Sequence, residues 1–296
     1  VYLTTAIPVG DRFASAPFNV PPDHDNVGVF QRHQFAVLAL DRATGSLLWQ
    51  RKVAEAVPHA GGHQTGSLAS ASPVGDGELV IASFGSQGLY ALDRQGEVRW
   101  QKDLGVLHSK HAHGEGSSPA LHDDTLVVNW DHEGPSFLVA LDKHPGEERW
   151  GVARDEDTSW SSPVIVEVEG RAQVIVNGTN RVRGYDLATG ATLWECGGLS
   201  HNIVASPVVA DGVLVAGSSY EKKAMFAIRL DGAAGDITDS EHVLWTRQRG
   251  TPYVPSPLLV DGLVYFLGHY QNVLSIVDLA SGRDRGGPFR LAEIHD

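Results

Sequence analysis

The fold is indicated by the stretch Ala39-Leu40-Asp41-Arg42-Ala43-Thr44-Gly45-Ser46-Leu47-Leu48-Trp49. Complete or shortened copies of this stretch recur along the chain. The other copies end at Trp100, Trp150, Trp194 and Trp245. In the quoted copy Asp41 and Thr44 cap a tight turn, and Gly45 supplies the positive φ that the turn needs. The tryptophan after the turn offers a large surface that can be buried against a neighbouring repeat.

Five Ser-Pro pairs alternate with these tryptophans, and each pair opens a new apolar run. They are Ser72-Pro73, Ser118-Pro119, Ser162-Pro163, Ser206-Pro207 and Ser256-Pro257. The resulting period of roughly 40 to 50 residues is typical of β-propeller blades. Because proline cannot donate a ladder hydrogen bond, we expect these prolines inside the innermost strand of each blade, where one edge faces a central channel.

Each repeat contains four short apolar runs, which predicts a four-stranded antiparallel sheet per blade. In the fifth repeat we expect strands at residues 203–209, 213–216, 225–228 and 243–246. Asp-Gly pairs, which favour tight hairpins, occur at Asp76-Gly77, Asp211-Gly212 and Asp261-Gly262. The repeats run nearly end to end, so residues 1–296 are predicted to form a single all-β domain.

The tryptophan phrase resembles the docking motif of the PQQ-like, or quinoprotein-type, β-propeller repeat family. Residues 227–238 and 251–257 resemble the bacterial PQQ-binding-like propeller proteins. More distant likenesses are to the outer-membrane-protein assembly lipoprotein and to the quinoprotein alcohol dehydrogenases. The resemblance covers almost the whole chain, and it implies a bacterial propeller that is extracytoplasmic and usually periplasmic.

The resemblance implies seven or eight blades, whereas six repeat units are visible. Residues 1–6 read as a second strand without a first, and residues 288–294 read as a fourth strand without a following blade. We therefore expect part of a larger propeller, incomplete at both ends, whose exposed edge strands favour self-association. A closed six-bladed ring is the alternative.

Composition narrows the range of partners. The formal net charge of -13 disfavours nucleic acid and anionic membrane surfaces, because both repel an acidic protein. No apolar stretch approaches the roughly 18 residues that a transmembrane helix needs. Cys196 is the only cysteine, so no intrachain disulfide can form. A small polar ligand or an envelope protein is the expected partner.

The histidines are distributed unevenly over the two faces of the predicted blades. Eleven of the 14 fall in loops on the face that carries the blade-to-blade connections, where propellers commonly bind ligands. Only His122, His144 and His242 fall on the other face. The eleven are His24, His33, His59, His63, His108, His111, His113, His132, His201, His269 and His295.

The densest patch contains His111, His113 and Glu115, which alternate along the chain. In an extended segment all three would lie on one side, and two imidazoles with a carboxylate suit zinc or another transition metal. His63, His132 and Asp157 are second-choice ligands from neighbouring blades. The alternative is that these side chains are hydrogen-bonded loop residues around a wet channel.

A polar ligand has further candidate contacts on the same face. Trp130 and Trp160 stand outside the docking phrase and could stack on a sugar or quinone ring, although plain packing is the commoner role of such residues. The whole candidate set is Trp130, Trp160, Arg181, His201, Tyr253 and His269.

These features favour a non-catalytic binding scaffold in the cell envelope, with the histidine-rich loop face as its binding surface. A quinoprotein dehydrogenase that uses PQQ is the alternative enzyme, and a metal-binding propeller is a third hypothesis. The dehydrogenases that the repeat resembles carry an adjacent cysteine pair against the cofactor, which Cys196 alone cannot supply. The chain also lacks a nucleophile elbow, a phosphate loop and a dinucleotide-binding fingerprint, so catalytic residues are not predicted.

Overall fold

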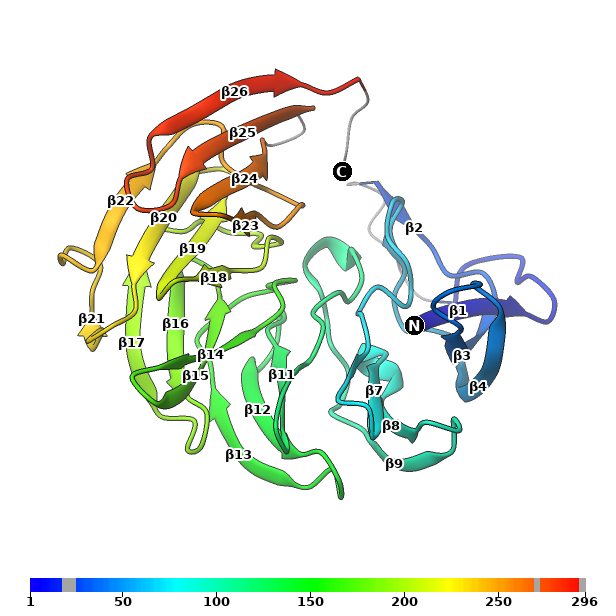
Figure 1. Cartoon of the computed structure of the whole chain (residues 1–296). Coiled ribbons are helices and arrows are strands. Elements are labelled where there is room, and N and C mark those ends of the chain that lie inside the picture. The colour runs from blue at the N-terminus through cyan, green and yellow to red at the C-terminus, as the bar shows by residue number, and fades with distance from the viewer. Residues whose placement is uncertain (18–24, 269–271, 293–296) are drawn as a thin grey trace. The chain divides into compact units, whose positions relative to one another are not determined.

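The computed structural model describes residues 1–17, 25–268 and 272–292. These residues form antiparallel sheets joined by turns, with two short 3-10 turns, η1 (Gly85–Gln87) and η2 (Lys110–Ala112), as the helical elements described. None of the described helices is long or apolar enough to cross a membrane. The predicted fold class, an all-β propeller of antiparallel blades, is confirmed (Figure 1). The chain divides into unit 1 (Val1–Ala153) and unit 2 (Arg154–Asp296).

Unit 1 contains three blade sheets and a small ribbon. Their strand orders are β1-β3-β4, β6-β7-β8-β9, β10-β11-β12-β13 and, for the ribbon, β2-β5. The strands are β1 (Tyr2–Val9), β2 (Asn26–Val27), β3 (Arg32–Leu40), β4 (Leu47–Ala56), β5 (Gly62–His63), β6 (Val74–Gly75), β7 (Leu79–Ser83), β8 (Leu89–Asp93), β9 (Val98–Lys102), β10 (Ala120–His122), β11 (Thr125–Trp130), β12 (Phe137–Asp142) and β13 (Glu148–Ala153). The first sheet has three described strands, as expected from its missing Ser-Pro run.

Unit 2 also contains three blade sheets, ordered β14-β15-β16-β17-β21, β18-β19-β20-β22 and β23-β24-β25-β26. Their strands are β14 (Val164–Val168), β15 (Arg171–Asn177), β16 (Arg181–Asp186), β17 (Thr192–Gly197), β18 (Val208–Ala210), β19 (Val213–Ser218), β20 (Ala224–Arg229), β21 (Gly235–Asp236), β22 (Val243–Arg247), β23 (Leu258–Val260), β24 (Leu263–Leu267), β25 (Val273–Asp278) and β26 (Asp284–Arg290). The short β21 pairs with β17 in parallel, unlike the antiparallel pairs of the blades.

The Ser-Pro pairs lie before the first strands and not inside them, so that prediction is wrong. β18 begins at Val208, directly after Pro207, and the predicted strand at 203–209 is replaced by a loop and this shorter strand. Proline lacks an N–H and pushes the preceding residue out of regular pairing, so it marks the strand's start. The last strand also ends earlier than expected, at Arg290.

The serine of each pair joins neighbouring sheets. In unit 1 the N–H of Ser72 donates to the hydroxyl of Ser118, 2.9 Å away. In unit 2 the N–H of Ser162 donates to Ser206, and that of Ser206 donates to Ser256, both at 2.9 Å. The repeated serine is therefore an inter-sheet hydrogen-bond acceptor, a role that its sequence position alone does not reveal.

Three tryptophans dock on the turn of the next sheet, which confirms the predicted packing. The indole N–H of Trp100 donates to the carbonyl oxygen of Lys143 at 2.6 Å. A Cβ added to Gly146 would lie 2.7 Å from the same ring, so the glycine leaves room for it. Trp49 bonds Arg94 and Trp245 bonds Leu279 in the same manner, at 2.9 and 2.8 Å.

Trp194 departs from this plan because the turn of the following sheet is expanded. It is fully buried and donates to the side chain of Gln173 in its own sheet at 2.9 Å. The expanded turn between β20 and β22 contributes β21, in which Gly235 pairs with Trp194. The insertion thus covers the tryptophan instead of leaving it on a tight turn.

Successive residues of the central strands enter different cores. In β7, Leu79 and Ile81 pack toward the sheet that contains β11 and β12, whereas Val80 and Ala82 pack toward the sheet that contains β3. Because side chains alternate across a strand, each central strand is buried on both faces. The same holds in unit 2, where Leu214 and Val215 of β19 belong to two separate core clusters.

Candidate functional site

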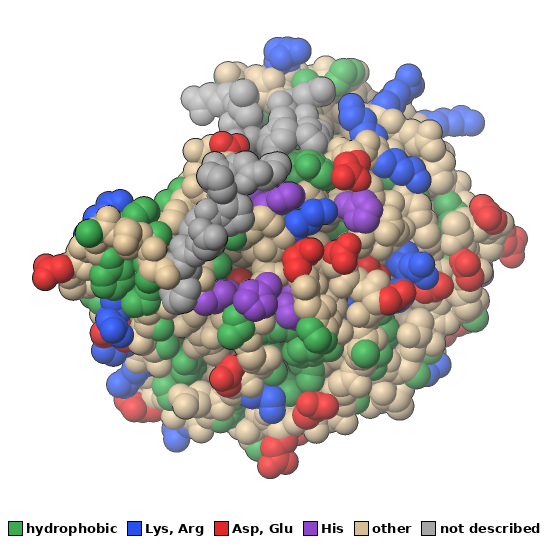
Figure 2. Space-filling view, turned by 180° about the vertical axis from the view of Figure 1, so that it is seen from behind, with side chains coloured by type: hydrophobic (Ala, Val, Ile, Leu, Met, Phe, Trp, Pro, Cys, Tyr) green, Lys and Arg blue, Asp and Glu red, His purple; other side chains and the backbone are tan. Residues whose placement is uncertain are grey.

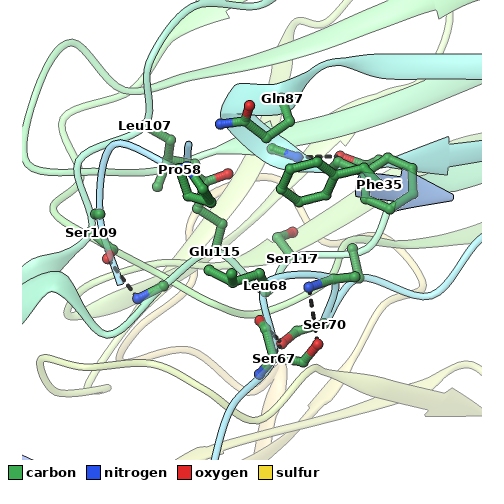
Figure 3. A pocket seen from close by; sticks show the side chains of 18 of the residues that line it. Phe35, Pro58, Ser67, Leu68, Ser70, Gln87, Leu107, Ser109, Glu115 and Ser117 are labelled. Atoms are coloured by element: carbon green, nitrogen blue, oxygen red, sulfur yellow. Dashed lines mark hydrogen bonds between the residues drawn. The ribbon is translucent and has the colours of Figure 1, made fainter. Parts of the chain in front are cut away.

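A pocket in unit 1 collects loop residues from three sheets around a cavity of about 50 Å³. Its walls come from the segment after β4, from η1, from the segment after β9 and from the end of β11. Figure 3 shows Glu115 among the lining side chains, with Pro58 and Leu107 drawn on one side and Leu68 and Ser117 on the other. The aromatic lining residues are Phe35, Phe84 and Trp130.

Glu115 is the acidic residue of this pocket, and its side chain is about 21% exposed. One carboxylate oxygen accepts a hydrogen bond from the backbone N–H of Ser86 at 2.7 Å, and the other accepts from the Ser86 hydroxyl at 2.6 Å. Burial raises the pKa of Glu115 to about 7, although both hydrogen bonds act in the opposite direction. Near neutral pH this carboxyl group therefore changes its charge readily.

The absence of a side chain at Gly85 leaves room for the carboxylate of Glu115. The φ of Gly85 is +54°, and a Cβ built on it would lie 1.3 Å from an oxygen of Glu115. Only glycine permits this approach of the η1 backbone to the acid. Ser86 is fixed in turn, because its hydroxyl accepts a hydrogen bond from the N–H of Leu107 at 2.7 Å.

His59 is the second ionisable residue of the pocket. Its Nε2 lies 3.0 Å from the carbonyl oxygen of Leu107, to which it must donate, and 3.8 Å from Glu115. Burial lowers the pKa of His59, and repulsion by His108 lowers it further, while the bond to Leu107 opposes both. His59 is therefore held mainly neutral at pH 7.

Six histidines of unit 1, of which His132 is buried, form what we call the histidine surface. Figure 2 shows histidine side chains, in purple, gathered in a row on one face of the molecule. Two series of ring contacts build the surface: His59 to His108 to His132, with ring centroids 5.6 and 6.5 Å apart, and His63 to His113 to His111, with centroids 5.1 and 5.4 Å apart. The structure thus brings these six histidines into ring contact within unit 1, and their role as a binding face stays a prediction.

The backbone explains why the second series forms. The N–H of His63 donates to the carbonyl oxygen of His113 at 3.0 Å, so β5 runs beside the segment that follows η2. The side chain of Asn26 donates to the carbonyl oxygen of His111 at 2.5 Å. These two bonds connect the β2-β5 ribbon to η2.

The predicted alternation of His111, His113 and Glu115 along an extended segment is wrong. His111 lies in η2 with a φ of +56°, which turns the chain, and Glu115 points to Ser86 instead of to the imidazoles. Within the described residues no three His, Cys, Asp or Glu side chains are arranged as a metal site. Metal binding here stays a prediction, and His63 is the residue that lies nearest to His113 by ring contact.

The other second-choice ligands are separated. His132 is in the histidine surface, where its ring stacks on His108. Asp157 belongs to unit 2, and its carboxylate lies 4.0 Å from Nδ1 of His201.

The predicted ligand-face residues are mainly packed or paired. Trp130 is buried, stacks on Phe137 at 5.9 Å and forms one wall of the pocket in unit 1. In unit 2, Tyr253 stacks on Tyr220, and Arg181 forms an ion pair with Glu195 at 3.0 Å. The backbone N–H of Trp160 donates to Ile203. His269 lies outside the described residues, as do His24 and His295.

Sequence reasoning did not identify Gly85 or Ser86, which position the acid. It also did not identify the buried Arg183 of β16, whose guanidinium contacts Asp155, Glu156 and Glu195 at 2.5 to 3.1 Å. A Gly-Ser pair between two apolar runs was the available signal for η1. Nothing in the local pattern indicates that the partner of this pair is an acid 29 residues later.

Comparison with known proteins gives a family and a fold. The family model of the outer membrane protein assembly factor BamB matches residues 13–108 and 33–287. No curated protein matches the chain. The structure of BamB from Moraxella catarrhalis is similar with a TM-score of 0.57 and 16% identity, over 95% of this chain and 78% of that chain.

Two enzyme structures share the fold over less of their length. A quinohemoprotein alcohol dehydrogenase, ADHIIG, from Pseudomonas putida HK5 has a TM-score of 0.50 and 16% identity, over 73% of this chain and 41% of that chain. A europium-containing methanol dehydrogenase has the same TM-score and identity, over 76% and 50%. At this level of identity the likeness shows the fold alone, since one propeller supports unrelated functions.

Proposed function

The chain belongs to the family of the outer membrane protein assembly factor BamB, and from this premise we propose that it is a non-catalytic binding scaffold of the bacterial cell envelope. Its binding surface is the histidine surface of unit 1, and its ligand is an envelope protein or a small polar molecule. The proposed location is extracytoplasmic, in the periplasm, as the resemblance to the propeller family implies.

One observation carries the proposal: a pocket with a partly buried acid shares His59 with one of the two series of histidine ring contacts. Glu115 is 3.8 Å from His59, which belongs both to the pocket and to the histidine surface. Scattered surface histidines require no explanation, whereas histidine rings in contact with one another beside a pocket are suited to recognition. The net charge of -13 favours a partner with a cationic surface.

The residues present do not fit a quinoprotein dehydrogenase. Cys196 is buried in the core of unit 2, and burial raises the pKa of its thiol to about 12. A ring disulfide of adjacent cysteines cannot form from a single cysteine. We therefore assign no step to PQQ.

Site-specific photocrosslinking tests the scaffold proposal. A photoreactive amino acid in place of His108, in cells that produce the protein, should yield a defined adduct with one envelope protein. The same amino acid in place of Glu78, which is exposed in unit 1 outside the histidine surface, is the matched control. Identical adducts at both positions, or none at His108, would contradict a partner on this surface.

Metal binding is a second candidate function, favoured by the ring contacts of His63, His111 and His113. Neutral imidazoles are common zinc and copper ligands, and these three residues are partly exposed. Protein purified without a histidine tag should contain near-stoichiometric metal that a His111→Ala, His113→Ala double variant loses. A His122→Ala, His144→Ala double variant is the control, and equal metal content in both variants would exclude the site.

A further inference from the structure

We propose that the pocket around Glu115 binds a primary ammonium group carried on a short aliphatic chain, such as the side chain of a lysine. The proposal deepens the proposed function, on which it rests for the idea that a partner approaches this face. It adds the chemistry of the group that is recognised, and it identifies Glu115 as the counter-ion.

The charge of the pocket points to a cation. Among the described residues that line it, only Glu115 and His59 can ionise. His59 is the one ionisable group within 4 Å of the carboxylate in the described residues, and its Nε2 proton is already donated to Leu107. A partly buried carboxylate is costly without a positive partner. Because the described residues supply no fixed cation here, a cationic ligand would be stabilised at this position.

The carboxylate also retains acceptor capacity. Each oxygen accepts one hydrogen bond from Ser86, whereas a carboxylate has about four acceptor positions. An ammonium group has three donors in a compact arrangement and fits the remaining positions. The bonds to Ser86 hold the acid in place, so a ligand pays little for ordering it.

The residues that line the pocket indicate what kind of chain carries the ammonium group. Phe35, Phe84 and Leu68 provide apolar surface for an aliphatic stem, and Trp130 adds an aromatic face of the kind that attracts cations. The cavity of about 50 Å³ has room for roughly four water-sized groups, as a short alkylammonium needs. A divalent metal would find a single carboxylate, and an anion would be repelled.

Binding is expected to depend on pH. The pKa of Glu115 is about 7 because of burial, so a cation that binds the ionised form must displace a proton at lower pH. Affinity should fall up to tenfold per pH unit below 7 and level off above 8. The other titratable group that lines the pocket is His59, after β4, and its protonation would repel the cation in the same direction.

The test uses n-butylamine and a short blocked peptide with one lysine as probes, titrated into the whole chain at pH 6, 7 and 8. The expected result is saturable binding at pH 8 that Glu115→Gln weakens at least tenfold. Glu133→Gln is the matched control, because Glu133 is exposed and its N–H bonds the backbone of His108. This control should change affinity less than twofold.

A second pair of variants keeps the proposal testable if Glu115→Gln does not fold. Gly85→Ala would displace the carboxylate and should also weaken binding, whereas Gly77→Ala places a Cβ at positive φ in open space and should not. Tetramethylammonium, which has no N–H donor, should bind the unaltered chain at least tenfold more weakly than butylamine. Equal affinity for the two cations, or an unchanged affinity in Glu115→Gln, would overturn the proposal.

The outcomes separate this proposal from the scaffold proposal. Binding of butylamine but not of the lysine peptide supports the site with a free amine as its source, and binding of both supports a protein lysine. If crosslinking at His108 captures a partner whose affinity is the same in Glu115→Gln, the ammonium site fails while the scaffold stands. If butylamine binds and no partner is crosslinked, the ammonium site stands alone.

Discussion

At the scale of single residues, the molecule places an acid whose pKa is raised by burial where three loops meet. Glu115 is supported by Ser86 and by the absence of a side chain at Gly85. Most other carboxylates with shifted pKa values lie in tight turns, where they accept hydrogen bonds. Asp278 is typical, because hydrogen bonds from Ser281 and then Arg285 lower its pKa to about 2. The fold therefore stabilises the ionised form of Asp278 in a turn and disfavours the ionised form of Glu115 in the pocket.

The raised pKa of Glu115 predicts how stability depends on pH. The folded state holds the proton more tightly than the unfolded chain does, so between pH 4.5 and 7 this residue lowers the free energy of unfolding as pH rises. Relative to the unaltered chain, Glu115→Gln should gain on the order of 2 kcal/mol between pH 4.5 and pH 8. Urea unfolding at both pH values measures this, and a difference that stays constant with pH would refute it.

At the scale of secondary-structure elements, each sheet is fixed to the next by two repeated contacts. One is the tryptophan on the following turn, and the other is the hydrogen bond between successive Ser-Pro serines. The first was predictable, because an indole after a tight turn has few places to be buried. The second was not, since a hydroxyl shows no preference for a partner about 45 residues away.

Two glycines with nearly the same backbone conformation allow the contribution of the tryptophan contact to the free energy of unfolding to be measured. Gly146 and Gly45 have φ values of +72° and +73°, but only Gly146 lies under an indole ring. Gly45→Ala should cost about 1 kcal/mol for the left-handed conformation. Gly146→Ala should cost a further 1 to 3 kcal/mol, roughly, for overpacking against Trp100. Equal losses of stability in thermal unfolding would mean that the ring moves freely.

The serine contact has its own test at Ser206. Ser206→Ala leaves the N–H of Ser162 without its acceptor, which should cost about 1 kcal/mol. Ser206→Thr keeps a hydroxyl and should recover most of that stability in chemical denaturation. A threonine variant as unstable as the alanine variant would indicate that packing, not the hydroxyl, matters at this position.

At the scale of the whole molecule, the blade plan followed from the sequence, whereas the site did not. Turn chemistry and the tryptophan period are local and could be identified in a single copy such as residues 39–49. The pocket combines segments from three sheets, and the geometry of η2 reverses the side-chain alternation expected around His111. Long-range contacts of this kind depend on tertiary packing, so spacing in the chain could suggest the histidines and Glu115 but not the residues that position Glu115, which are Ser86 and Gly85.

Exposed strand edges give a prediction for the molecule in solution. Leu47 and Leu48 of β4 are 55% and 64% exposed, and β4 is an outer strand of its described sheet. Leu48→Lys should reduce concentration-dependent self-association in sedimentation velocity, because a charge blunts an edge strand. Gln50→Lys adds the same charge to the same strand without removing apolar surface, and it should have the smaller effect. If both variants act equally, net charge and not the apolar edge controls association.

The pairing of β21 with β17 has a practical consequence for protein engineering. Long surface turns are the usual places to insert an epitope tag or graft a loop, and the expanded turn of residues 231–240 looks like the best one in unit 2. However, Gly235 of this turn is paired with Trp194, which is fully buried. An insertion there would expose the indole, whereas the short turn at Thr44-Gly45, with open space around its glycine, is the safer acceptor.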